Sequence, residues 1–416
     1  MRIYQVGGSI RDKLLNRTSQ DRDFVVIGAT EEQMLQEGYK KVGKSFPVFL
    51  HPKTQEEYAL ARKEIKTGVS HKDFKFIFTP DITLEEDSMR RDFTCNAIYQ
   101  DVQTGEIIDY HNGINDIKNH ILRHVSEHFS EDPLRVLRMC RFSAQLDFEV
   151  APETMQLCKD MVQNGDLKHL SKERIWQELE KALSYPNCYK FILKAKECGA
   201  LKEILPEIDE LWNVPERKDY HPEGNSGAHT ILALKKAQST NPIVNFAILF
   251  HDVGKAKTDK SQWPSHHHHD ELGAMLIKNI GKRLKIPEKY IKFASFAIAH
   301  HMLYHKKIED VEMEITLTAI ELSEHKNDSY KNDFIAVMKA DMQGRDLPEF
   351  TEEIEHFNAF QHYLEQLIEK AKTISVRDIP EFEEILNKVK HHQLPASTIK
   401  ETLAKKILAE IKNLSV

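Results

Sequence analysis

The spacing of hydrophobic residues divides the chain into two parts. Up to about residue 120, short β-branched or aromatic runs are bounded by glycine, proline or polar clusters, which is typical of strands. The expected strands are Ile3–Val6, Phe24–Ile27, Phe46–Leu50, Tyr58–Ala61 and Glu106–Asp109. From about Asn119 onward the strand pattern stops, and apolar residues recur every three or four positions. This spacing predicts amphipathic helices, most clearly over Asp132–Leu146, Lys172–Leu183 and Tyr189–Cys198.

The pattern therefore predicts an α+β protein with a small mixed α/β head followed by an all-α body. Two prolines and mixed charge interrupt the helical pattern at Val214–Glu223. We expect four segments: a head over residues 1–120, a helical neck over 121–215, a third segment over 216–345 and a helical tail over 346–416. At 416 residues, the chain is long enough for several domains.

Composition narrows the class of protein. The chain is 40% hydrophobic and 30% charged, too balanced for a disordered or fibrous protein. It has no apolar run of the roughly 18 residues that a membrane span needs, and its N-terminus lacks the features of a signal peptide. We therefore expect a cytoplasmic protein without membrane contact. The five cysteines are scattered, as expected of reduced thiols.

The net charge of −7 argues mildly against a nucleic-acid partner. A local basic groove can still exist on an acidic protein, so this argument is weak. The 22 histidines are more informative, because many of them cluster between His221 and His305. Imidazole is the commonest side-chain metal ligand near neutral pH.

A glycine pair follows the first expected strand and precedes a helix start. Gly7 and Gly8 have no Cβ atoms, so backbone N–H groups there can approach a ligand closely. The helix N-terminus that follows favours anions, and Arg11 offers a planar guanidinium to the same phosphates. A glycine pair alone is usually only a turn, so this segment gains meaning from its neighbours.

Two aspartates stand at the start of the second expected strand. Residues two apart on a strand project from the same face, so Asp21 and Asp23 point the same way, with Cα atoms roughly 6.6 Å apart. That span suits joint coordination of two cations about 3.5–4 Å apart, as in an in-line phosphoryl displacement. Mg²⁺ prefers oxygen ligands of this kind. The pair is therefore a candidate magnesium site.

Together, the segment Val6–Leu15 and the Asp21–Asp23 pair resemble the signature of class II nucleotidyltransferases of the DNA polymerase β superfamily. The layout of nearly the whole chain, except about the last seventy residues, is most similar to the multifunctional bacterial CCA-adding enzymes that carry an HD domain. The resemblance implies that Gly8 and Arg11 contact the incoming nucleotide and that Asp21 and Asp23 carry Mg²⁺. Glu57 is our candidate for a third carboxylate.

Two further segments extend the resemblance. Arg90–Ala97 is similar to the RRDFTxNA motif of the family, where Arg91 suits triphosphate charge and Asp92 can accept a hydrogen bond from a ribose 2′-OH. Asp109–Asp116 resembles the next family motif, but Tyr110 replaces its usual proline, so we expect a less rigid loop.

The segment Glu131–Arg141 predicts a helix with a charged stripe. Asp132, Arg135, Arg138 and Arg141 recur every third residue and span about 13 Å. The three arginines repel one another unless an anion lies along them. An enzyme without a nucleic-acid template must read the base with protein groups, and a carboxylate beside a guanidinium can pair with cytosine or adenine. The family's EDxxR motif, which Asp132 and Arg135 match, implies this role. Arg138 and Arg141 are then available to base, sugar or triphosphate.

The histidine cluster contains a second signature. His251-Asp252-Val253-Gly254-Lys255, with His229 upstream and Asp341 downstream, matches the H…HD…D pattern of HD-domain phosphohydrolases. Imidazole and carboxylate ligands suit a transition metal such as Ni²⁺, which activates a water molecule for attack on phosphorus. His251 and Asp252 are the expected catalytic pair, and His269 and His301 are further candidate ligands. The resemblance implies 2′,3′-cyclic phosphodiesterase, 2′-nucleotidase and phosphatase activities.

The leading hypothesis is addition of CCA to tRNA from CTP and ATP. Two alternatives remain open: a poly(A) polymerase on the same head, and an RNA-binding HD phosphohydrolase whose head is inert. Lysines over residues 385–412 indicate either a solvated helix face or a contact with the tRNA backbone. We expect a monomer or a homodimer.

Overall fold

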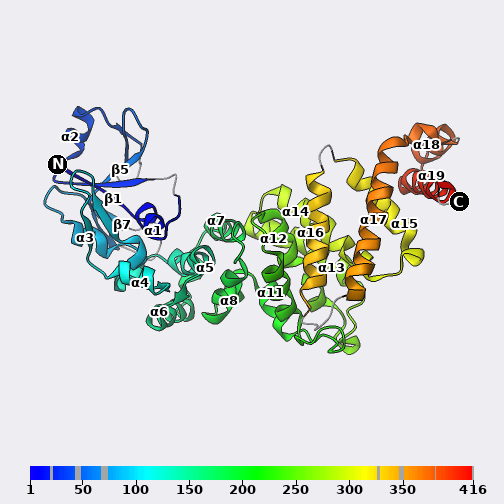
Figure 1. Cartoon of the computed structure of the whole chain (residues 1–416), viewed down its shortest axis with the longest axis horizontal. Coiled ribbons are helices and arrows are strands. Elements are labelled where there is room, and N and C mark those ends of the chain that lie inside the picture. Colours follow the sequence, from blue (N-terminus) through cyan, green and yellow to red (C-terminus); the bar gives the residue numbers. More distant parts are fainter. Residues whose placement is uncertain are drawn as a thin grey trace. The chain divides into compact units, whose positions relative to one another are not determined.

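The computed structural model describes residues 1–18, 22–42, 48–66, 74–325, 328–345, 351–379 and 381–414. The chain forms two compact units (Figure 1). The first comprises Met1–Ala182 and Asn187–Leu205, and the second comprises Leu183–Pro186 and Pro206–Val416. Across the described ranges, no helix is both long enough and apolar enough to cross a membrane.

A seven-stranded sheet organises the first unit, in the order β3-β4-β5-β2-β1-β8-β9. Its strands are β1 (Arg2–Val6), β2 (Asp23–Ile27), β3 (Lys40–Lys41), β4 (Val48–Leu50), β5 (Glu57–Leu60), β8 (Ile98–Asp101) and β9 (Ile107–Asp109). β2 and β5 are parallel, and the other neighbouring strands are antiparallel. Also in this part are an antiparallel pair, β6 (Lys63–Lys66) and β7 (Phe74–Ile77), and helices α1 (Gly8–Leu14), α2 (Glu31–Gln36), α3 (Leu84–Met89) and α4 (Gly113–Lys118).

Both faces of the central strands are covered. Phe24 of β2 stacks on Tyr58 of β5, with ring centroids 4.4 Å apart, in a cluster that includes Met34 of α2. Val25, the next residue of β2, packs in a cluster on the opposite face with Val6. Because side chains alternate along a strand, Asp23 belongs to the face of Val25.

The remainder of the first unit is mainly helical. Its helices are α5 (Leu134–Leu146), α6 (Pro152–Gln163), α7 (Lys172–Leu183), α8 (Tyr189–Glu197) and α9 (Ala200–Ile204). Pro133 lies at the start of α5, where its missing N–H costs no helical hydrogen bond. Two-residue strands β10 (Ile121–Leu122) and β11 (Glu149–Val150) pair in parallel beside α5.

The second unit is built from helices joined by turns and loops, and its described residues contain no strand. Its α-helices are α10 (Pro206–Glu210), α11 (Ser226–Ala237), α12 (Pro242–Phe250), α13 (His269–Leu284), α14 (Glu288–His300), α15 (Ile308–Ser323), α16 (Ser329–Gln343), α17 (Thr351–Thr373), α18 (Phe382–Lys390) and α19 (Ser397–Leu414). The almost wholly apolar α12 is buried among α11, α14 and α16. Short 3₁₀ helices complete the chain: Thr94–Asn96, Glu127–Glu131, Asp166–His169, Leu211–Asn213, Val253–Lys257, Lys260–Gln262, His301–His305 and Val376–Asp378.

The predicted α+β head and helical body agree with this architecture, but four strands of the head, β3, β6, β7 and β8, were not among the predicted ones. β8 was not predicted, because Ile98 and Tyr99 are both fully buried and therefore lack the alternation that marks a half-buried strand. The expectation that strands stop near Asn119 is wrong, since β10 and β11 follow that point. Strands of two residues are too short to leave a periodic pattern. The expected strand Phe46–Leu50 is described only from Val48 onward.

Candidate active sites

The glycine loop joins β1 to α1. Gly7 has a φ of 81°, a conformation that favours glycine, and its N–H donates to the carbonyl of Ile98. Arg11 is buried, and its guanidinium donates to Asn96 Oδ1 at 2.7 Å and to the neighbouring Asp12 carboxylate. Arg11 therefore connects the glycine loop to the RRDFTxNA-like segment.

The register of the sheet brings the predicted carboxylates to this loop. Asp23, the first residue of β2, is paired with Val6, the last residue of β1, and with Glu57, the first residue of β5. Neighbouring strands are about 4.8 Å apart, and paired residues of parallel strands project from the same face. Asp23 and Glu57 thus stand side by side, and Asp23 also lies beside the end of β1, where Gly7 follows. Asp21 lies outside the described residues.

Arg91 approaches the same loop through a network that the sequence did not indicate. A Cβ atom added to Gly7 would lie 4.0 Å from Arg91 Nη1. Arg91 donates to the Tyr99 hydroxyl at 2.9 Å and to Asp87 at 3.2 Å, and Tyr99 also donates to Asp87. Asp87 is fully buried; burial alone would raise its pKa, but Arg90 and Arg91 hold the pKa well below its usual range.

Asp92 and Arg138 form a two-pronged ion pair. Arg138 Nε and Nη2 lie 2.8 and 2.5 Å from Asp92 Oδ2, while Asp92 Oδ1 accepts from Asn96 and from the backbone of Phe93. Burial tends to raise the pKa of Asp92, but Arg138 outweighs it and lowers the pKa to about 2. Asp92 is therefore a charged acceptor that orients Arg138.

The other charged residues of α5 also have protein partners. Arg135 donates to the carbonyls of His128 and Arg90, Arg141 donates to Glu178 at 2.5 Å, and Asp132 accepts from Arg174 at 2.9 Å. The repulsion expected among the three arginines is relieved by protein acceptors, so it does not by itself require a bound anion. The Phe142 ring also lies 4.0–5.3 Å from the guanidinium carbons of Arg11, Arg138 and Arg141.

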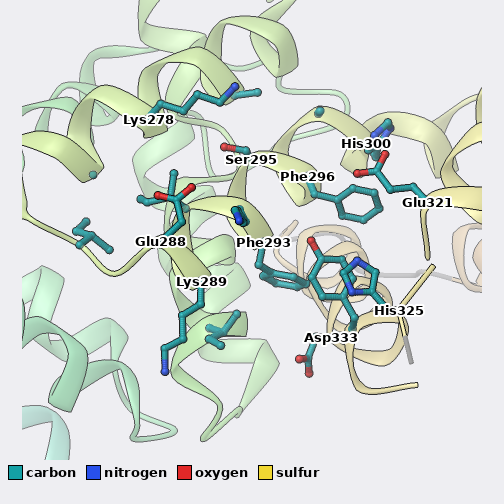
Figure 2. Close-up of a pocket in the computed structure, with 18 of the residues that line it drawn as sticks. Lys278, Glu288, Lys289, Phe293, Ser295, Phe296, His300, Glu321, His325 and Asp333 are labelled. Carbon is teal, nitrogen blue, oxygen red and sulfur yellow. The ribbon is translucent and has the colours of Figure 1, made fainter. Parts of the chain in front are cut away.

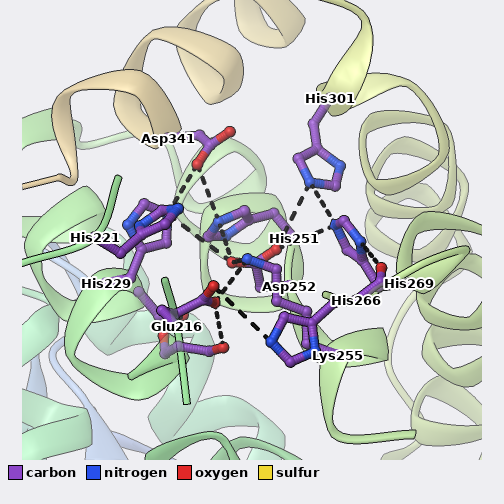
Figure 3. Close-up of polar contacts among 12 residues, drawn as sticks. Glu216, His221, His229, His251, Asp252, Lys255, His266, His269, His301 and Asp341 are labelled. Atoms are coloured by element: carbon purple, nitrogen blue, oxygen red, sulfur yellow. Dashed lines mark hydrogen bonds and ion pairs between the residues drawn. The ribbon is translucent and has the colours of Figure 1, made fainter. Parts of the chain in front are cut away.

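In the second unit, four predicted residues converge from three helices (Figure 3). His229 comes from α11, His251 and Asp252 follow α12, and Asp341 comes from α16. His229 Nε2 lies 2.8 Å from Asp341 Oδ1 and 3.9 Å from Asp252 Oδ2. His251 Nε2 lies 3.2 Å from Asp252 Oδ2 and 3.5 Å from Asp341 Oδ1. All four are buried.

His269 and His301 lie on the other side of Asp252. Their Nε2 atoms are 3.3 Å apart, and they lie 3.4 and 3.7 Å from Asp252 Oδ1. Asp252 therefore stands between two groups of imidazoles, with one carboxylate oxygen toward each. In each group, three ligand atoms lie within 4.8 Å of one another, a spacing compatible with a metal ion.

The imidazoles are oriented as metal ligands usually are. Nδ1 of His251, His269 and His301 lies 2.7–2.8 Å from the carbonyl three residues earlier, and Nδ1 of His229 lies 3.1 Å from Glu223. A hydrogen bond at Nδ1 leaves Nε2 free for a metal. In the described part of the chain, the buried atoms His251 Nε2 and Asp252 Oδ2 form ion-pair contacts but no hydrogen bond of acceptable geometry. Both observations fit a bound cation.

The electrostatics of the site point the same way. Burial would lower the pKa of His251, but Asp252 and Asp341 outweigh it and raise the pKa to about 10. The site therefore stabilises positive charge. His269 differs: burial, aided by Lys255, lowers its pKa to about 4. This keeps the His269 imidazole neutral, which is the form that binds a metal.

Sequence reasoning assigned no role to two charged neighbours of Asp252. The buried Lys255 Nζ lies 2.9 Å from Asp252 Oδ2 and 2.8 Å from Glu216 Oε1. Lys255 is part of the recognised His-Asp motif, so the sequence could have indicated that it lies beside the site. No such indication existed for Glu216, because this residue lies in a segment between two helices that was identified only as an interruption of the helical pattern. These residues line a cavity of about 470 Å³ together with Arg217, Tyr220 and Arg345.

A larger cavity of about 1210 Å³ lies elsewhere in the second unit, along α13, α14, α15 and α16 (Figure 2). Its wall includes Phe293, Phe296 and Tyr330. None of the predicted site residues lines it. Five exposed lysines border it, and in the described chain four of them form no ion pair: Lys278, Lys282, Lys289 and Lys292.

Comparison with known families gives three matches along the chain. The Poly A polymerase head domain matches residues 3–123, the probable RNA and SrmB-binding site of polymerase A matches 147–211, and the HD domain matches 227–331. The class is thus a nucleotidyltransferase head joined to an HD domain.

Relatives narrow this class. The multifunctional CCA protein of Vibrio vulnificus is 46% identical over 350 residues, which cover 83% of this chain and 86% of the relative. That of Teredinibacter turnerae is 45% identical over 83% of this chain and 85% of the relative. The chain belongs to the multifunctional CCA protein family, as the sequence motifs predicted. Membership favours CCA addition over the poly(A) alternative.

Solved structures share the fold. A CCA-adding enzyme in its apo form II has a TM-score of 0.60 at 20% identity, covering 99% of this chain and 91% of that chain. The Thermotoga maritima CCA-adding enzyme complexed with tRNA has a TM-score of 0.56 at 19% identity, with the same coverage. The predicted fold class, a nucleotidyltransferase head with a helical body and an HD domain, is therefore confirmed.

Proposed function

We propose that this chain adds and repairs the 3′-terminal CCA of tRNA from CTP and ATP by two-metal nucleotidyl transfer. The main supporting observation is the register that pairs Asp23 with Glu57 on one side and with Val6, the residue before the glycine loop, on the other. Asp21 and Asp23, with Glu57 as a third carboxylate, would hold Mg²⁺, which stabilises charge on the attacking and leaving oxygens. Gly8, Arg11 and Arg91 would position the triphosphate.

Base selection is assigned to Asp132 and Arg135. Asp132 uses one carboxylate oxygen for Arg174 and the other for the backbone N–H of Leu134. Each oxygen keeps a second lone pair that can accept from the amino group of cytosine or adenine. Arg135, held by two carbonyls, would donate to the ring acceptor of the same base. Asp92 would accept the ribose 2′-OH in exchange for one of its two hydrogen bonds from Arg138. Arg138 and Arg141 would support base, sugar or phosphates.

The test is stepwise extension of a tRNA that ends before CCA, with labelled CTP, then ATP. We expect two C additions and one A addition by the wild type. Asp23→Asn and Glu57→Gln should each lower addition by at least about 100-fold, since a metal ligand is lost. Asp101→Asn, which changes a half-buried carboxylate at the end of β8, is the matched control. Long A tails without C incorporation would refute the CCA assignment.

For the second unit we propose metal-dependent hydrolysis of phosphoesters at damaged RNA ends: 2′,3′-cyclic phosphodiesterase, 2′-nucleotidase and phosphatase activity. His229, His251, Asp252 and Asp341 would hold a transition metal such as Ni²⁺, with His269 and His301 as further ligands; the metal lowers the pKa of a bound water molecule. Lys255 would attract the phosphate. The support is the inward-facing set of imidazole Nε2 atoms around two buried carboxylates.

Asp252→Asn tests this second activity. We expect loss of 2′,3′-cyclic phosphate hydrolysis and of Ni²⁺ binding by equilibrium dialysis, with CCA addition unchanged. Asp270→Asn, on the same domain but outside the cluster, should leave both unaffected. If Asp252→Asn protein still bound Ni²⁺ and hydrolysed the cyclic phosphate, the proposed site would be wrong.

We further propose that the lysines along the larger cavity contact tRNA phosphates. Lys278 and Lys282 lie on α13, and Lys289 and Lys292 lie on α14. A lysine that binds an RNA phosphate releases a counterion from the RNA, which favours binding. A lysine without an ion pair in the protein can do so without first losing a contact to a carboxylate. By contrast, Lys388, Lys400 and Lys412 of the tail pair with Glu384, Glu324 and Glu312. The tail contact stays a prediction, as do the four segment boundaries and the monomeric or dimeric state.

A further inference from the structure

An exposed aromatic side chain stands at the edge of the cavity that contains the HD residues. Tyr220 is 53% exposed and lines the same cavity as Asp252 and Asp341. The volume of about 470 Å³ falls in the range of about 300–1,000 Å³ that is usual for small-molecule sites. Burial of a tyrosine ring is favourable, so a ring left half open beside a reactive centre offers a surface to a ligand.

Arg217 fixes one side of this ring. Its guanidinium carbon lies 4.8 Å from the ring centroid, and Asp219 accepts from Arg217 Nη2 at 2.6 Å. The backbone N–H groups of Tyr220 and His221 both donate to the carbonyl of Arg217, at 3.0 and 2.7 Å. The tyrosine therefore sits on a short turn that holds its side chain against a cation.

The same turn continues directly into the metal-ligand cluster. His221 Nδ1 lies 2.8 Å from Glu223 Oε1, and that oxygen lies 3.1 Å from Nδ1 of His229. Tyr220 is thus one residue away from a chain of contacts that ends on a proposed metal ligand. This link ties the turn that carries Tyr220 to His229.

We propose that Tyr220, supported by Arg217, is a nucleobase platform for the HD site. The base of the 3′-terminal nucleotide stacks on the ring, while its 2′-phosphate or 2′,3′-cyclic phosphate reaches Lys255 and the cluster around Asp252. Aromatic stacking tolerates any base, because every base has a π-face. The site then selects nucleotides over other phosphoesters without reading sequence. This inference rests on the proposed phosphohydrolase function.

The test compares two substrates that differ only in the nucleobase: guanosine 2′-monophosphate and 1-O-methylribose 2-phosphate. Guanine is chosen because the head is proposed to select cytosine and adenine. Loss of one stacking partner at an exposed site should raise KM for the guanosine compound by about 5- to 10-fold in Tyr220→Ala protein. The KM for the base-free compound should not change. Tyr220→Phe should restore the wild-type KM, and Tyr110→Ala, at an exposed tyrosine of the first unit, is the control.

The outcomes separate the platform from the phosphohydrolase. An equal rise in KM for both compounds, or no rise for either, would overturn the platform while the hydrolytic activity stands. If wild-type protein loaded with Ni²⁺, Mn²⁺ or Mg²⁺ hydrolysed neither compound, the proposed activity would fail. Equilibrium dialysis of guanosine 2′-monophosphate then decides the platform: weaker binding to Tyr220→Ala protein supports it, and equal binding refutes it.

Discussion

Gly254 of the His-Asp motif is a position where one added methyl group should disable the second site. A Cβ atom there would lie 1.8 Å from the carbonyl oxygen of His269 and 2.6 Å from the backbone nitrogen of Gly273. A carbon–oxygen contact normally needs about 3.3 Å, so α13 must retreat by more than about 1 Å. Since these are backbone atoms, no side-chain rotation relieves the clash.

The cost follows from this geometry. Overpacking typically costs about 1–3 kcal/mol, and a backbone collision belongs at the upper end. His269 begins α13 and moves with it, so the imidazole is displaced from Asp252 by a similar distance. A misplacement of about 1 Å can lower a rate by roughly 100-fold. We therefore expect Gly254→Ala to destabilise the second unit by about 3 kcal/mol and to lower 2′,3′-cyclic phosphate hydrolysis by about 100-fold.

Gly281→Ala, on α13, is the matched control. Its Cβ would lie 2.5 Å from Ile291 Cδ1 and 2.7 Å from Ile291 Cγ1, which are side-chain atoms rather than backbone atoms. We expect a smaller stability loss than at Gly254, and near-normal hydrolysis, because Ile291 is not a proposed metal ligand. The assays are denaturant unfolding, cyclic phosphate hydrolysis and CCA addition, which should stay normal in both variants. The reasoning is refuted if Gly254→Ala protein matches Gly281→Ala protein in unfolding and hydrolysis.

Three further predictions concern the head and the proposed RNA surface. Asp92 has a pKa of about 2, below its usual value of 3.8. Its ionised form therefore adds about 2 kcal/mol of stability above pH 4, which is lost as pH falls toward 2. In Asp92→Asn protein, the free energy of unfolding measured with denaturant should vary less with pH in this window. An unchanged pH profile would count against the ion pair. Arg135→Ala should reduce CTP/ATP discrimination more than triphosphate affinity in single-nucleotide assays, and unchanged fidelity would contradict the proposed role. The double variant Lys282→Glu, Lys289→Glu should bind tRNA more weakly, and the salt dependence of binding should fall by about two ions. The double variant Lys388→Glu, Lys400→Glu in the tail should have less effect. Equal effects of the two variants would exclude the cavity surface as the tRNA contact.

The local parts of both sites were predictable because their residues are close in sequence. The glycine pair with Arg11, and His251 with Asp252, are short segments whose spacing already limits where the side chains point. The amphipathic helix over α5 was also visible as a period of three to four. β10 and β11 were missed because a pair of two-residue strands carries no periodic signal, and their pairing joins residues 28 apart in the chain.

The partnerships across the fold needed the structure, and they change how the motifs are understood. Asp23 and Glu57 become neighbours only because β2 and β5 are parallel and in register, which no local pattern encodes. No local pattern encodes the partner of Arg138 either, because its charge is balanced by Asp92, which belongs to a different motif. In the second unit, Glu216 and Lys255 neutralise each other beside Asp252. A motif therefore identifies the reactive groups, but their charge states depend on residues brought in by packing. Asp92 therefore orients Arg138 in addition to its proposed contact with the ribose, and Glu216 positions Lys255, although only Asp92 lies in a recognisable motif.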